Sequence, residues 1–196
     1  MAGGLIGRAG VWAVAAAALV VVGGGLVAAD QKHGEAALNP RLEQQAGFTV
    51  IGISVRTSNA KERQESQIGK QWARLMQEKL LGTIPHRADQ DTIAIYTDYA
   101  SDKDGEYTYV LGARVTKADE VPAGMVAKQV PAGKYAVFTS ERGPVQRVVV
   151  GTWMRIWNTP KDQPGGDRGY KTDFELYDQR AQNPADAIAE VHIGIR

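Results

Sequence analysis

Residues 173–178 read DFELYD, and this stretch alternates in the manner of a β-strand. Phe174 and Leu176 fall on one face of the strand, whereas Glu175 and Tyr177 fall on the other. An apolar face is what a strand in a packed domain needs. A carboxylate beside a phenol is informative only if that face borders a cavity instead of solvent, so Glu175 is the first residue to explain.

An internal repeat connects this strand to the first half of the chain. Three pairs of residues recur in the same order at almost one offset: Trp72 and Trp153 are 81 apart (153 − 72), Tyr96 and Tyr177 are 81 apart (177 − 96), and Gly112 and Gly194 are 82 apart (194 − 112). We interpret this regularity as an internal duplication, in which two strand–helix–strand–strand units build one α+β domain on one sheet or on two facing sheets.

The two copies differ at one informative position. When Tyr96 is aligned with Tyr177, Ala94 falls opposite Glu175, so the first copy has a small neutral residue where the second has a carboxylate. The apolar face is kept in both copies. We therefore interpret Glu175 as a residue of a site and not of the shared scaffold.

Hydrophobic periodicity predicts the elements of the two units. Polar residues and prolines separate the predicted segments. These segments are strands at 48–55, 92–99 and 106–115, one amphipathic helix at 60–81, a strand near residue 125, a strand at 134–139, a helix from 144 that ends before 160, and strands at 173–178 and 189–195.

Composition excludes several classes of function. The chain has 23 Lys and Arg against 22 Asp and Glu, so no basic excess points to nucleic acid. It has no cysteine, which excludes disulfides and thiolate chemistry. The three histidines, His33, His86 and His192, share no ligand spacing, and we predict neither a metal site nor a cofactor.

The first residues differ in kind from the rest. Residues 1–29 carry a single charge, Arg8, and the apolar run at 9–29 ends at Asp30. This pattern predicts an export signal cleaved before Asp30 or, alternatively, an uncleaved membrane anchor at 9–29. Either version places the folded part in the periplasm or elsewhere outside the cytoplasm. Residues 30–46 are then a linker, and residues 47–196 form the domain.

Several stretches together resemble a known family. VPAGKYAVFTSERGP (130–144) leading into a Trp-bearing helix, DFELYD and the closing AEVHIGI, combined with the duplication, resemble the GyrI-like small-molecule-binding domain over about residues 48–195. This domain is also the effector-binding domain of many AraC- and MerR-type transcription regulators. The resemblance implies a pseudo-twofold α+β fold with an aromatic-lined cleft between the halves, and it places Glu175 in that cleft.

The family binds hydrophobic and cationic compounds, and some relatives hydrolyse small strained or electrophilic molecules with a glutamate and a tyrosine. This chain departs from the regulators because its N-terminus resembles an export signal and not a DNA-binding segment. We therefore expect a small-molecule ligand, no nucleic-acid partner, and at most a membrane tether through residues 9–29.

The resemblance and the strand pattern together suggest a set of ligand-binding residues. Glu175 is expected to supply charge complementarity, because a carboxylate in an apolar cleft is costly unless a partner or a ligand meets it. Aromatic side chains are expected to form stacking walls, although each is also suited to a core: Tyr177, Tyr96, Tyr109, Tyr135 and Trp153.

Three functions are compatible with these residues. The first is non-covalent binding of a small, partly apolar compound that can carry a positive charge. The second is hydrolysis, in which Glu175 activates water and a tyrosine holds the leaving group. The third is a protein-interaction module that grips its partner through a sheet edge.

Overall fold

The strands that alternation predicts form one antiparallel sheet in a computed structural model, which describes residues 40–196. The sheet has eight strands in the order β1-β6-β8-β7-β3-β4-β2-β5. In chain order the elements are β1 (Arg41–Gln45), β2 (Phe48–Ser58), α1 (Asn59–Glu65), α2 (Gln67–Gln77), the 3₁₀ turn η1 (Leu80–Thr83), β3 (Thr92–Thr97), β4 (Glu106–Val115), β5 (Val126–Val130), β6 (Gly133–Thr139), α3 (Val145–Asn158), β7 (Arg168–Tyr177), the 3₁₀ turn η2 (Gln179–Ala181) and β8 (Glu190–Ile195).

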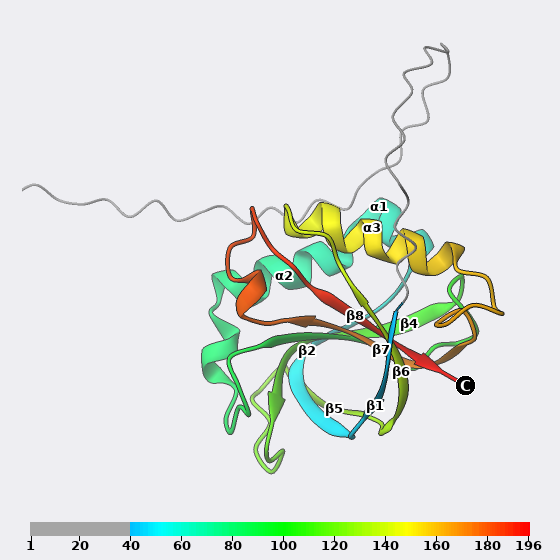
Figure 1. Cartoon of the computed structure of the whole chain (residues 1–196). Coiled ribbons are helices and arrows are strands. Elements are labelled where there is room, and N and C mark those ends of the chain that lie inside the picture. Colours follow the sequence, from blue (N-terminus) through cyan, green and yellow to red (C-terminus); the bar gives the residue numbers. More distant parts are fainter. Residues whose placement is uncertain (1–39) are drawn as a thin grey trace, which may run out of the picture.

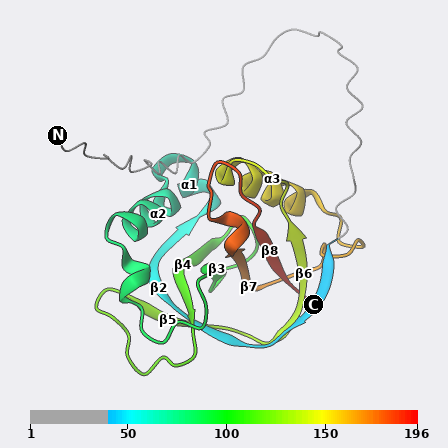
Figure 2. The same cartoon turned by 60° about the vertical axis from the view of Figure 1, so that its left-hand side comes forward.

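The helices all lie over one face of a strongly curved sheet (Figures 1 and 2). Read outward from the central β3–β7 pair, one half of the sheet runs β3-β4-β2-β5 and the other runs β7-β8-β6-β1. Both predicted units therefore contribute to one sheet, and α1 and α2 belong to the first unit whereas α3 belongs to the second. The α+β class is confirmed.

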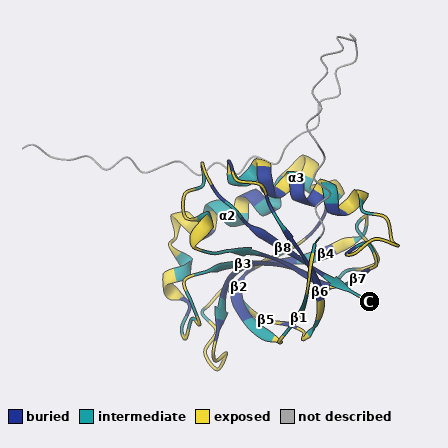
Figure 3. Ribbon diagram, viewed as in Figure 1, coloured by how far each residue is buried: buried dark blue, intermediate teal, exposed yellow. Residues whose placement is uncertain are grey.

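The apolar face of DFELYD lies in the core on the side of the sheet away from the helices. Phe174 is 1% exposed and packs with Ile93 and Ile95 of β3. Its ring centre lies 5.3 Å from that of Phe48 and 5.5 Å from that of Tyr135. The middle of the sheet is buried, whereas the connecting loops are largely exposed (Figure 3). Strand alternation thus leaves Glu175 on the helix-covered face.

The predicted single helix at 60–81 is broken in the structure into α1, α2 and η1. Ser66 has a left-handed backbone (φ 51°) and ends α1, with its N–H donating to the Glu62 carbonyl. The Glu62 carboxylate then accepts the Ile68 N–H at 2.9 Å, which satisfies an amide at the start of α2. Apolar spacing continues across the break, and this explains why periodicity alone does not reveal it.

Part of the predicted linker at 30–46 is a strand in the structure. Arg41–Gln45 form β1, which pairs with β6 at one edge of the sheet. The predicted signal or anchor at 1–29 and the first part of the linker lie outside the described residues. Within residues 40–196, none of the helices has the length and apolar character needed to cross a membrane.

Candidate functional site

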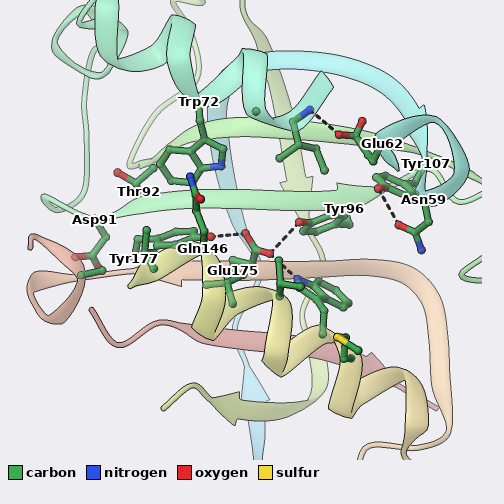
Figure 4. Close-up of a pocket in the computed structure, with 18 of the residues that line it drawn as sticks. Asn59, Glu62, Trp72, Asp91, Thr92, Tyr96, Tyr107, Gln146, Glu175 and Tyr177 are labelled. Atoms are coloured by element: carbon green, nitrogen blue, oxygen red, sulfur yellow. Dashed lines mark hydrogen bonds between the residues drawn. The ribbon is translucent and has the colours of Figure 1, made fainter. Parts of the chain in front are cut away.

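A cavity of about 710 Å³ lies over the helix-covered face of the sheet. Side chains of α1 and α2 form one wall and side chains of α3 form the opposite wall, while β3 and β7 supply the floor (Figure 4). The walls are mainly apolar, and their main side chains are Ile68, Trp72 and Met76 from the first wall and Val149, Trp153 and Trp157 from the second.

Glu175 lies on the floor of this cavity and is 2% exposed. Glu175 pairs across the sheet with Ala94 of β3, which has a small side chain. Oε1 accepts hydrogen bonds from the Tyr96 hydroxyl at 2.8 Å and from the Trp153 Nε1–H at 2.6 Å. Oε2 accepts one from the Tyr177 hydroxyl at 2.7 Å. Figure 4 shows the carboxylate between the two tyrosines.

The environment of Glu175 opposes its charge. Burial raises the pKa of Glu175 above its usual range, and the hydrogen bonds from Trp153, Tyr177 and Tyr96 act in the opposite direction. Burial and the nearby carboxylate raise the pKa of both tyrosines well above the ordinary value, so both remain neutral donors. None of the three side chains that donate to the carboxylate is charged.

Aromatic rings surround the carboxylate on both sides. The ring centres of Trp72 and Tyr177 are 4.9 Å apart, in an edge-on arrangement. Tyr96 and Trp153 also lie 4.9 Å apart and edge-on. The site therefore combines a single buried carboxylate with ring faces from α2, β3, α3 and β7.

The structure brings together four of the six residues expected to bind ligand: Glu175, Tyr177, Tyr96 and Trp153 all line the cavity. Tyr109 lies beneath it, fully buried, with its ring centre 5.2 Å from that of Tyr96, and it does not line the cavity.

Tyr135 is not brought to the cavity. It projects from β6 toward the opposite face of the sheet, where it packs with Phe174, and its hydroxyl donates to the Pro131 carbonyl at 3.1 Å. Alternation along β6 fixes which of its residues share a face with Tyr135, but only the register of the whole sheet decides which face that is.

A buried ion pair at the cavity was not anticipated. Arg168, at the start of β7, lines the cavity and donates through Nη2 to Asp173 Oδ2 at 2.6 Å. Asp173 also accepts the Tyr99 hydroxyl at 2.7 Å and the Gly194 N–H at 2.9 Å. Alternation in DFELYD does place Asp173 on the same face as Glu175. Alternation does not predict the position of Arg168 in the same way, because the pairing of β7 with β8 is irregular between residues 168 and 173.

Metal chemistry finds no support in the described part of the chain. No group of three or more His, Asp or Glu side chains that could hold a metal ion occurs between residues 40 and 196. Besides Glu175, the phenols, the indoles and Arg168, the charged side chains of Glu62, Arg63, Asp91, Lys103 and Asp178 also line the cavity.

Comparisons with known proteins place the chain in a family. A family model described as integron-associated effector binding protein matches residues 41–195. YobU of Bacillus subtilis (strain 168), described as a transcriptional regulator protein, is 34% identical over 147 residues, which are 74% of this chain and 90% of YobU.

Solved structures share the fold. An integron cassette protein from the mobile metagenome of Vibrio cholerae is 26% identical and has a TM-score of 0.61 over 81% of this chain and 96% of that one. The structure of SAV2435 bound to tetraphenylphosphonium has a TM-score of 0.59 at 19% identity, over 80% of this chain and 93% of that one.

Proposed function

The chain belongs to the family of integron-associated effector-binding proteins, and we propose that it binds a small hydrophobic cation in the cavity above Glu175. One observation carries this proposal: a fully buried carboxylate accepts three hydrogen bonds, and every donor is neutral. Tyr96, Tyr177 and Trp153 hold the carboxylate in place, and their rings provide contact area for the ligand.

The energetics of burial favour a cationic ligand. A buried carboxylate costs several kcal/mol unless it is paired, and hydrogen bonds from neutral donors offset only part of that cost. A cation above the carboxylate supplies the missing charge. Each aromatic face that it contacts adds about 0.5–2 kcal/mol of cation–π attraction. A cavity of about 710 Å³ lies within the range of small-molecule sites.

The hydrogen bonds on Glu175 favour one type of cation. Oε1 already accepts from Tyr96 and Trp153, so both of its lone pairs are used. A quaternary or delocalised cation needs no hydrogen bond, so the carboxylate can attract it with all three of these hydrogen bonds in place. Tetraphenylphosphonium, with which SAV2435 was solved, is a cation of this type and is the probe of choice.

The duplication accounts for a single carboxylate at this place. With an offset of 81 residues, Ala94 and Glu175 are equivalent positions, and the β3–β7 register pairs them directly. In the proposed pseudo-twofold arrangement the axis therefore passes through this pair. A glutamate in both copies would place two like charges directly opposite each other, which is destabilising. A carboxylate in one copy alone avoids this repulsion.

The test is a calorimetric titration of tetraphenylphosphonium into the parent protein and into Glu175→Gln. We expect the variant to bind at least about tenfold more weakly, equivalent to about 1.4 kcal/mol. Glu78→Gln, a surface glutamate paired with Arg74, is the matched control and should leave the affinity unchanged.

The alternatives drawn from the sequence predict other results for the parent protein and Glu175→Gln. Hydrolysis predicts product from small electrophilic esters that disappears in Glu175→Gln. A protein-interaction module predicts no binding of the cation by either protein. Equal affinity of the parent and Glu175→Gln for tetraphenylphosphonium would overturn the proposed role of the carboxylate.

A further inference from the structure

Exposed hydrophobic side chains gather along the cavity. Within residues 40–196, six large hydrophobic residues are substantially exposed, and four of these six line the cavity. These four, which we call the apolar rim, are between 38% and 46% exposed: Met76 of α2 and Val150, Met154 and Trp157 of α3. Hydrophobic side chains that are exposed together in one place mark binding sites on protein surfaces.

Helical spacing explains why α3 presents this apolar surface beside the cavity. Four apolar residues follow the spacing i, i+3, i+4 and i+7, which places them on one face of the helix: Val150, Trp153, Met154 and Trp157. The adjoining face of α3 is buried in the core through Val148 and Ile156. The rim is therefore additional to the surface with which α3 packs on the sheet.

The apolar rim is continuous with the carboxylate site. Trp153 is only 8% exposed and donates its Nε1–H to Glu175 Oε1 at 2.6 Å. Its ring centre lies 6.1 Å from that of Trp157, which is one helical turn further along α3 and far more exposed. Apolar surface thus leads along α3 from the buried carboxylate toward solvent.

The inner part of the cavity and the rim differ in the chemistry that they offer. The inner part presents the Glu175 carboxylate among aromatic rings, which attracts a positive charge. The rim side chains carry no charge, so they favour a hydrocarbon group that removes their apolar surface from water. Because α2 and α3 stand on opposite walls (Figure 4), a slender group that leaves the cavity between them can contact Met76 on one side and Trp157 on the other.

We propose that the apolar rim is an outer subsite that binds the hydrocarbon tail of an amphiphilic cation whose charged head lies above Glu175. This inference rests on the proposed function and narrows the ligand class to cations with a delocalised or quaternary head and a flexible apolar tail. Glu175 recognises the charge of such a compound, and the rim discriminates among tails of different length.

The experiment titrates three probes with the same charged head into the full chain, at concentrations at which they stay monomeric: methyl-, butyl- and heptyltriphenylphosphonium. Complete burial of one methylene group raises the affinity about fourfold. An open wall covers only part of the tail, so we expect about twofold per methylene, or about eightfold for each step of three methylenes.

The variant for this test is Met154→Ser combined with Trp157→Ser. We expect the ratio of heptyl to methyl affinity to fall from about sixtyfold in the parent to less than about tenfold. The matched control is Leu42→Ser combined with Val121→Ser, because these two hydrophobic residues are also exposed but do not line the cavity. The control should retain the ratio of the parent.

Glu175→Gln separates the head from the tail. We expect it to weaken the binding of all three probes and to retain the heptyl-to-methyl ratio, because the contacts of the tail do not depend on the charge. If the parent binds all three probes equally tightly and in a Glu175-dependent manner, the proposed function stands and the outer subsite is refuted. If none of the probes binds, both the proposed function and this inference fail.

Other results would refute the outer subsite alone. One is a rim variant that keeps the full ratio, which would place the tail elsewhere. If this variant also changes the sedimentation of the protein, the rim is instead an interface between copies of the chain. Another is a control that lowers the ratio as much as the rim variant does. If the double variant does not fold, Met154→Ser and Trp157→Ser measured separately decide the same comparison.

Discussion

At the scale of single residues, the proposed binding of a cation depends on the ionisation of Glu175. Burial acts to protonate this carboxyl, and its three neutral donors act to keep it ionised. The balance leaves its pKa above the usual range, which ties both binding and stability to pH.

The first prediction concerns binding as a function of pH. The charge of tetraphenylphosphonium does not change with pH, whereas protonation of Glu175 removes the negative charge that attracts it. We expect the affinity to fall by up to about tenfold per pH unit below the raised pKa of Glu175, until it reaches the level of Glu175→Gln. Glu175→Gln should show a flat profile. Calorimetric titrations between pH 4 and 8 measure both, and a parent profile as flat as that of the variant would contradict the prediction.

The second prediction concerns stability and compares two glutamates whose pKa values are shifted in opposite directions. The raised pKa of Glu175 means that its contribution to stability is fully present below the unfolded-state value near 4.5 and is lost as the pH rises through the folded-state value. Glu175→Gln should therefore be at least as stable as the parent at pH 8, with an advantage that disappears toward pH 4.5.

Glu190 provides the matched comparison. Contacts with His192, and after it Arg180, lower the pKa of Glu190 to about 2. Its contribution is therefore present above the unfolded-state value and is lost as the pH falls through about 2. We expect Glu190→Gln to be less stable than the parent at neutral pH, with the deficit closing in acid. Thermal unfolding at a series of pH values tests both variants, and parallel curves for the two would refute the assignment.

At the scale of elements, the close approach of strands accounts for two glycines on which the predicted repeat rests. A Cβ on Gly112 of β4 would lie 1.9 Å from the Ile51 carbonyl oxygen of β2, and a Cβ on Gly194 of β8 would lie 2.7 Å from the Thr172 carbonyl oxygen of β7. These contacts involve backbone atoms, which cannot move without separating the strands. Gly112 and Gly194 thus both exclude a side chain because the backbone of a neighbouring strand lies too close.

The third prediction follows from this packing. Gly112→Ala should destabilise the protein by about 2 kcal/mol or more, because β4 and β2 must move apart to admit the methyl group. Gly133→Ala, in β6, is the control, since a Cβ at that position would have no other atom within 4 Å. Urea unfolding measures the two values. A cost for Gly112→Ala no greater than that of the control would contradict the role of close strand approach.

At the scale of the whole molecule, one edge of the sheet is formed by a strand that precedes the predicted repeat. β1 covers β6 at the edge of the sheet, and Arg41 reaches the buried Glu190 of β8 at 3.5 Å. Without β1, the backbone groups of β6 on that side would face solvent. The family match, which begins at residue 41, includes this strand.

The fourth prediction tests this edge. A chain that begins at residue 47 should be less stable by about 1–2 kcal/mol than one that begins at residue 40. The backbone hydrogen bonds of β1 stabilise the folded chain by about this amount once the entropy lost in ordering the strand is subtracted. Their melting temperatures measure the difference. Equal melting temperatures would show that β1 adds nothing to the domain.

Export through residues 1–29 stays a prediction from the sequence.

Sequence patterns alone determined the α+β class, the family and the face of β7 on which Glu175 lies. The reason is local: side-chain direction in a strand follows from covalent geometry, so DFELYD separates Phe174 from Glu175 in any fold that keeps the strand. The repeat likewise predicted that both units have a strand corresponding to β3 and β7. The break at Ser66 was missed because hydrophobic spacing does not report a single left-handed residue.

Only the tertiary structure decided which aromatic residues meet Glu175. Tyr135 and Trp153 were equally plausible in sequence, but β6 turns Tyr135 to the far core whereas α3 carries Trp153 to within 2.6 Å of the carboxylate. The apolar rim of the cavity also appears only in the folded chain. Contacts of this kind depend on sheet register and on helices from distant parts of the chain, and neither is a property of any short stretch of sequence.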